Sequence, residues 1–266
     1  MHQRLALCLL VFGVAAIAQT DAPPDGAERE RILALMRQYV ATYGSRVPDV
    51  TYDTTITAFQ GRAASNKWHK QGTTYSSRIA HNGHEYYRPV GNNGEPVPRA
   101  QWKRGGGRPF NLWDVVEALG RATLVWNRWD TLRGHRLAVF DYTVGRQDSK
   151  WAVIEGSTGS AIVPYAGSVY VDPATGAVWR VSDVITDIPV RFKTRYASGT
   201  LDSDLIMIGT TQYLLPVTEI EIVRGEGEMD RRTELVYRNY HKFEVDSSID
   251  FLQVDSSVTF SDKESH

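Results

Sequence analysis

The chain has one cysteine in its 266 residues, Cys8, and it lies inside an apolar run near the N-terminus. This run, residues 5–18, is shorter than the roughly 20 apolar residues that cross a bilayer. It follows a positive residue and ends in Ala16-Ile17-Ala18, a site of the kind that signal peptidase cleaves. We therefore expect residues 1–18 to be a cleaved signal peptide rather than a membrane anchor, followed by a linker over 19–26. The protein is then expected in the periplasm or secreted.

Without the leader the chain contains no cysteine, which excludes disulfides and thiolate chemistry. Burial must then hold the exported protein together, and the remaining chain is long enough to form a sizeable core. An excess of basic residues is also missing, since 30 Lys and Arg face 31 Asp and Glu. This balance offers little cationic field for nucleic acid, which we exclude as a partner. We expect one monomeric domain over residues 27–251 and a tail over 252–266.

Catalytic motifs are missing as well. The sequence has no nucleophile elbow, phosphate-binding glycine loop or zinc-protease helix. His69, His81 and His84 are close in sequence and suggest metal ligands. Residues three apart on a hairpin point to opposite faces, so we interpret these as solvated histidines of a turn. The sequence therefore predicts no enzyme, no catalytic residue, no metal site and no cofactor.

Two pairs of acidic residues occur at strand spacing. Asp202 and Asp204 share one face of an expected strand, and Glu219 and Glu221 alternate with isoleucines. General acid or base chemistry needs enclosed carboxyl groups with shifted pKa values, and nothing in the sequence indicates enclosure. We interpret both pairs as parts of solvated strand faces.

The periodicity of the apolar residues predicts a mostly β protein. Residues 27–43 have helical spacing and predict an amphipathic helix, and residues 110–119 predict a second, short one. Residues 96–109 are rich in Gly and Arg and predict a mobile loop. Most of the rest alternates with period two and is rich in β-branched and aromatic residues. The expected strands cover residues 50–59, 68–79, 85–90, 122–130, 135–145, 149–156, 160–172, 177–186, 199–208, 211–224, 230–242 and 244–251.

The expected fold class is α+β with an antiparallel sheet, because strands and long helices do not alternate. The segment Asp172-Pro173-Ala174-Thr175-Gly176 predicts a hairpin turn in which Gly176 takes the left-handed conformation.

Aromatic residues are abundant, with 7 Trp, 13 Tyr and 8 Phe. Many of them fall on expected strands. They could form the core of a curved sheet packed on helices. They could equally line an apolar cleft that receives a ligand, and composition does not separate the two.

Three short motifs carry a resemblance to a known family. They are the hairpin Val171-Asp172-Pro173-Ala174-Thr175-Gly176, the strand Leu201-Asp202-Ser203-Asp204 and the strand Leu214-Leu215-Pro216. Together with the order of the expected elements, they resemble the periplasmic lipoprotein-localisation carriers (Lol-type) and related envelope-stress sensor domains. The resemblance implies a strongly curved, incomplete antiparallel barrel whose concave face is covered by the two helices.

The resemblance also implies a function without a catalytic residue. Carriers of this type accept acyl chains on the concave face and use an arginine to hold a closed state. Arg121, Arg128 and Arg133 are the candidates for that arginine.

We therefore expect an exported, non-enzymatic protein that binds a lipid, an acyl chain or a lipidated protein. The alternative is an interaction or envelope-sensing module that binds a protein partner through a sheet edge or the 96–109 loop. The expected lining of the apolar pocket is Leu112, Val116, Leu119, Trp126, Phe140, Tyr142, Tyr170 and Trp179.

Overall fold

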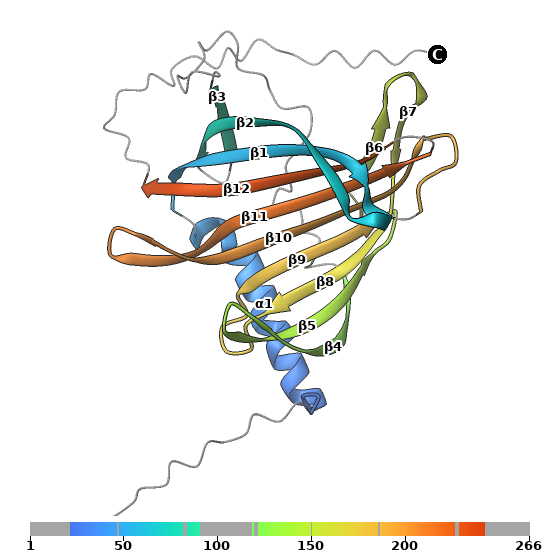
Figure 1. Ribbon diagram of the computed structural model, residues 1–266. Coiled ribbons are helices and arrows are strands. Elements are labelled where there is room, and N and C mark those ends of the chain that lie inside the picture. The colour runs from blue at the N-terminus through green and yellow to red at the C-terminus, as the bar shows by residue number, and fades with distance from the viewer. Residues whose placement is uncertain are drawn as a thin grey trace, which may run out of the picture.

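The computed structural model describes residues 22–46, 48–81, 84–90, 119, 122–149, 151–185, 187–226 and 229–242 (Figure 1). The expected signal peptide, the 96–109 loop, the strand over 244–251 and the tail lie outside the described residues. So does the expected helix over 110–119, apart from Leu119.

The N-terminal helix α1 spans Gly26–Arg46, close to the predicted range. Asp25 caps it, because its Oδ1 accepts a hydrogen bond of 2.8 Å from the backbone N–H of Glu28. The apolar stripe of the helix is buried against the sheet. Its buried members are Ile32, Leu33, Met36, Tyr39 and Tyr43.

The strands confirm the predicted mostly β, antiparallel fold. They are β1 (Val50–Arg62), β2 (Lys67–His81), β3 (His84–Val90), β4 (Thr123–Leu132), β5 (His135–Val144), β6 (Ala152–Glu155), β7 (Gly159–Ile162), β8 (Tyr165–Val171), β9 (Val178–Ile185), β10 (Thr194–Ile208), β11 (Thr211–Gly225) and β12 (Asp230–Lys242).

Three predicted strand boundaries need correction. The expected strand 160–172 is divided into β7 and β8 at Pro164, which has no N–H to donate to a ladder. The expected strand 149–156 is limited to Ala152–Glu155, and β10 begins at Thr194 rather than at residue 199.

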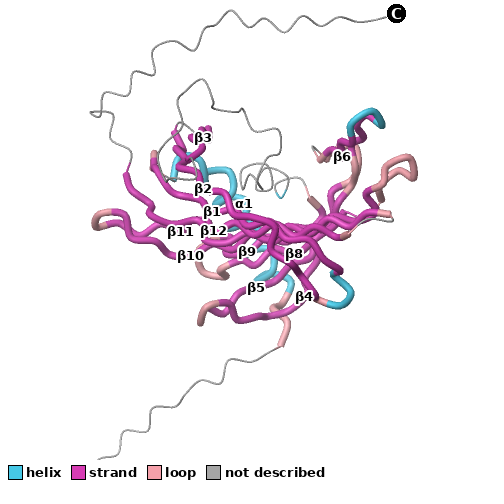
Figure 2. Tube along the Cα trace, turned by 45° about the horizontal axis from the view of Figure 1, so that its top comes forward, coloured by secondary structure: helices cyan, strands magenta, loops and turns pink. Residues whose placement is uncertain are grey.

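Ten strands form one open antiparallel sheet in the order β3-β2-β1-β12-β11-β10-β9-β8-β5-β4. The sheet is curved, as Figure 2 shows, and β3 and β4 are its edges. Pairing of β1 with β12 joins the two ends of the described chain, and pairing of β5 with β8 bypasses the separate β6–β7 hairpin.

The predicted turn between β8 and β9 is confirmed. The side chain of Asp172 accepts hydrogen bonds from the N–H groups of Ala174 and Thr175 at 2.8 and 2.9 Å. Gly176 has a φ of +74° and donates its N–H to the carbonyl oxygen of Asp172 at 2.8 Å. This turn brings Gly176 against the backbone of Leu35 in α1.

Two faces of the sheet follow from strand alternation. The helix face carries the cluster that includes α1, with Phe140, Val169, Val181 and Leu201 among its strand residues. The outer face carries a smaller cluster of four buried residues: Leu137, Val139, Tyr170 and Trp179. Among the described residues, no helix is both apolar enough and long enough to span a bilayer.

Candidate functional site

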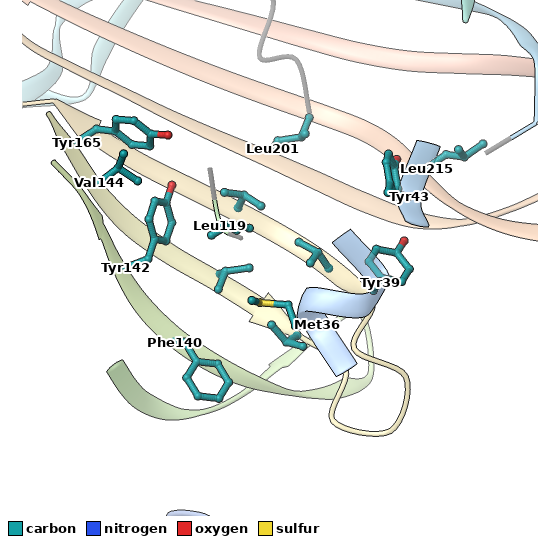
Figure 3. Packing of buried hydrophobic residues seen from close by; sticks show 14 of the residues in the cluster. Met36, Tyr39, Tyr43, Leu119, Phe140, Tyr142, Val144, Tyr165, Leu201 and Leu215 are labelled. Atoms are coloured by element: carbon teal, nitrogen blue, oxygen red, sulfur yellow. The ribbon is translucent and has the colours of Figure 1, made fainter. Parts of the chain in front are cut away.

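The helix face is lined with apolar and aromatic side chains, and α1 packs over them. Met36, Tyr39 and Tyr43 of α1 belong to the same buried cluster as Phe140 and Tyr142 of β5 (Figure 3). The hydroxyl of Tyr142 is also satisfied, since it donates to the carbonyl oxygen of Ser182 at 2.9 Å. Over β5, β8 and β9 the protein's own side chains therefore fill this face.

Four residues of the expected pocket lie together on the helix face. Leu119, Phe140 and Tyr142 are buried in its cluster, and Trp126 packs against it with its ring edge-on to Phe140 at 5.6 Å. Leu112 and Val116 lie outside the described residues.

The other two residues of the expected set lie on the outer face. Tyr170 precedes a register irregularity in the β8–β9 ladder, and Trp179 belongs to the same outer cluster. Tyr170 alternates with Val169 and Val171, which point to the helix face. The structure therefore does not bring Tyr170 and Trp179 together with the other lining residues.

Three acidic residues lie among the apolar residues of the helix face. Asp183 of β9 is 2% exposed and lies between Val181 and Ile185, both buried in the helix-face cluster. Glu219 of β11 is 0% exposed, and Glu221 follows it two residues along the same face. We call Asp183, Glu219 and Glu221 the acid site.

The sheet register places these carboxyl groups near one another. Asp183 pairs with Gly199 of β10, and Gly199 pairs in turn with Glu221. Because Gly199 has no side chain, nothing on the intervening strand separates the two carboxyl groups. Glu219 is one step along the same face and accepts a hydrogen bond of 2.5 Å from the hydroxyl of Tyr237.

Two carboxyl groups of the acid site have raised pKa values. Burial, reinforced by the charges of Glu221 and Glu219, raises the pKa of Asp183 to about 8. Burial also raises the pKa of Glu221. At neutral pH Asp183 is therefore mostly a neutral carboxylic acid, which can both donate and accept hydrogen bonds.

The acid site corrects the interpretation of Glu219 and Glu221 as solvated residues. Their strand is amphipathic as predicted, but the acidic side points into the protein rather than to water. One signal in the sequence was available for Asp183, because apolar residues stand two positions before and after it. An acid in such a row belongs to the face that Val181 and Ile185 bury.

Asp202 was also wrongly predicted to be solvated. It lies 9% exposed on the outer face and forms a two-bond pair with Arg180, at 2.5 and 2.6 Å. Asp204 forms a more exposed pair with Arg133 at 2.6 Å. These paired acids stabilise the outer face and are not candidates for a ligand site.

Two of the candidate closing arginines can be located. Arg128 donates to the hydroxyl of Tyr170 at 2.8 Å and pairs with Asp130 at 2.9 Å. Arg133 pairs with the acids of β10. Arg121 lies outside the described residues.

A separate hollow of about 310 Å³ lies where β6 meets the beginning of β10 and the end of β11. Its wall is largely polar, and Glu155 in it accepts hydrogen bonds of 2.7 Å from the N–H groups of Lys193 and Thr194. None of the expected pocket residues lines it. The lining residues are Glu155, Gly156, Thr158, Lys193, Thr194, Val223, Gly225, Met229 and Arg231.

Comparison with protein-family models and with curated proteins gives no match. Among solved structures, the chain is similar to a LolA superfamily protein from Nitrosomonas europaea, with 10% identity and a TM-score of 0.38 over 81% of this chain and 94% of that one. It is similar to a DUF1329 family protein from Desulfovibrio piger, with 13% identity and a TM-score of 0.40 over 87% and 98%. A domain described as an outer membrane lipoprotein-sorting protein, from Vibrio parahaemolyticus, has 9% identity and a TM-score of 0.41 over 80% and 92%.

These three structures are of the kind that the sequence resembles. With TM-scores of 0.38 to 0.41, they carry no information about what this chain binds. Among the described residues, no three His, Cys, Asp or Glu side chains are grouped so as to hold a metal ion.

Proposed function

We propose that this chain is an exported, non-enzymatic binding protein that holds a lipid, an acyl chain or another apolar ligand against the helix face of its sheet. Its place of action is the periplasm, and its partners include lipidated proteins. The proposed lining of the ligand site comprises the helix-face residues Leu119, Trp126, Phe140 and Tyr142.

One observation carries the proposal. The helix face combines a continuous apolar and aromatic surface with a buried carboxyl group whose Oδ1 has no hydrogen-bond partner among the described residues. Sites for small apolar ligands have this composition, since apolar walls supply affinity and a few polar groups fix the orientation. A surface built for stability alone leaves few such groups unsatisfied.

The contacts between α1 and the sheet are mainly apolar, which supports a role in which a ligand displaces the helix. Apolar side chains account for most of its buried surface, and Arg31 adds a hydrogen bond of 2.9 Å to the carbonyl oxygen of Pro173. Burial of apolar surface is not directional. An apolar ligand can therefore replace the contacts of Met36 and Tyr39 with the strands if the helix moves.

Native mass spectrometry with lipid extraction tests the proposal on protein purified from the periplasm of an expression host. We expect a co-purifying apolar species that is lost in Trp126→Gln, because this change places a polar group on the helix face. Val125→Gln is the matched control, since Val125 is the preceding residue of β4 and its side chain is 61% exposed. A protein that carries no apolar species and also ignores added fatty alcohol, fatty acid and lipopeptide would contradict the proposal.

A second candidate is a protein-interaction module, and the β6–β7 hairpin favours it. Ile154 and Ile162 lie diagonally on one face of this hairpin and are 74% and 43% exposed. Val190 is 88% exposed on the connection that Arg191 ties to β7 through the carbonyl oxygen of Ser160. Exposed apolar groups of this kind mark protein contacts. This candidate predicts mass spectra in which the protein carries no apolar species. It also predicts that the Ile154→Asp variant no longer binds its protein partner.

A further inference from the structure

Asp183 is a buried acid on the helix face with an unsatisfied oxygen. It is 2% exposed, and its Oδ1 has no hydrogen-bond partner among the described residues. A buried carboxylate without a partner loses several kcal/mol of solvation, by order of magnitude, so such groups are rare in stable cores. An unpaired acid in this position requires a reason beyond packing.

The titratable groups that act on Asp183 come from two strands of the sheet, β11 and β5, and each is separated from β9 by one strand. Glu219 and Glu221 of β11 interact with its charge, as does the hydroxyl of Tyr142 in β5. All of these groups are neutral or negative, and none of the described Lys, Arg or His side chains acts on the proton affinity of Asp183. The acid site is therefore a place of negative potential inside an apolar surface.

From this arrangement we propose that the acid site binds the protonated amine of an amphiphilic ligand whose apolar tail lies along the helix face. This inference rests on the proposed function and names the class of head group that the site selects. The ammonium donates hydrogen bonds to Asp183 and Glu221, and Glu219 adds a third negative group held by Tyr237. Binding displaces the proton of Asp183 into solvent.

Other occupants fit the site less well. The carboxylate of a free fatty acid meets like charges in a medium of low dielectric constant, which disfavours binding. A divalent metal ion needs several ligands that converge at short distance, and no such group occurs among the described residues. An ammonium group needs hydrogen-bond acceptors in a looser arrangement, and it supplies three donors to them.

Three probes with the same tail test the inference: dodecylamine, dodecanol and dodecanoate, each below its critical micelle concentration. Their affinities for the full protein are measured by calorimetry across a pH series. We expect dodecylamine to bind most tightly and dodecanoate most weakly. The affinity for dodecylamine should rise with pH by up to about tenfold per pH unit below the pKa of Asp183, because each binding event releases one proton.

Asp183→Asn and Asp204→Asn are the matched variants. Asp183→Asn should lower the affinity for dodecylamine to that for dodecanol and remove most of its dependence on pH. Asp204→Asn removes one carboxylate from the outer face. It should change neither the affinity for dodecylamine nor the dependence of that affinity on pH. If Asp183→Asn does not fold, the partly buried Glu221→Gln should show the same effects in weaker form.

The outcomes separate this inference from the function on which it rests. If all three probes bind with equal affinity, the inference is overturned while the proposed function stands. An affinity for dodecylamine that falls with pH, or that Asp183→Asn leaves unchanged, also overturns the inference. If no probe binds, the proposed function fails with it.

Discussion

At the scale of single residues, Asp183 makes the stability of the fold depend on pH. Its pKa rises from the usual 3.8 to about 8 on folding. The folded protein then keeps a proton that the unfolded chain gives up, so the stabilisation is complete below pH 3.8 and is lost as the pH rises to about 8. At 1.36 kcal/mol per pKa unit, the full loss is on the order of 5 kcal/mol.

We therefore expect the free energy of unfolding to fall as the pH rises from 3.8 to about 8, and to fall less in Asp183→Asn. Glu221 adds to the slope in the same direction, because burial raises its pKa too. Urea denaturation of both proteins across the pH range measures the difference. Parallel curves for the two proteins would show that Asp183 titrates normally in the folded state.

The sequence revealed the apolar residues of the site better than the polar ones. Phe140 and Tyr142 stand in an alternating strand, and alternation assigns both to one face. Alternation does not determine what covers a face. The prediction that Glu219 is solvated was wrong for that reason. Its burial depends on the rest of the helix face, including Tyr237, which is distant in sequence.

At the scale of elements, Gly176 fixes the position of α1 on the sheet. A Cβ atom there would lie 2.2 Å from the carbonyl carbon of Leu35, and φ is +74°. Gly209 provides a matched position, because φ is +61° and, in the described part of the chain beyond its two sequence neighbours, no heavy atom lies within 4 Å of an added Cβ. The two glycines differ in the contact with α1 and share the left-handed backbone.

We expect Gly209→Ala to lower the free energy of unfolding by about 1–2 kcal/mol, because alanine is strained in the left-handed conformation. Gly176→Ala should lower the free energy of unfolding by about 2 kcal/mol more than Gly209→Ala does, because α1 must shift away from its apolar contacts. Urea denaturation of both variants measures the two losses. Equal losses would mean that α1 does not depend on this close contact.

Individual elements were more predictable than their pairing. The periodicity of α1 and of most strands, and the Asp172 turn, follow from local sequence. Pro164 divides an expected strand because it lacks an N–H group, a local effect that apolar periodicity does not reveal.

At the scale of the whole molecule, the open curved sheet follows from contacts that no local pattern specifies. Pairing of β1 with β12 and of β5 with β8 joins segments far apart in the chain. The acid site depends on such pairing, since its members come from β9 and β11 on either side of β10. The family resemblance indicated the curvature. Composition did not indicate a buried acid, and the spacing of Val181 and Ile185 around Asp183 was the one local signal for it.

The location of a bound apolar chain is the central claim at this scale. Photolabelling measures it directly, with a fatty alcohol that carries a diazirine on its tail and with peptide mapping of the labelled protein. We predict labels on α1 and on the helix-face residues of β4 and β5, including Trp126. Labels confined to the β6–β7 hairpin or to the outer face around Trp179 would contradict the account.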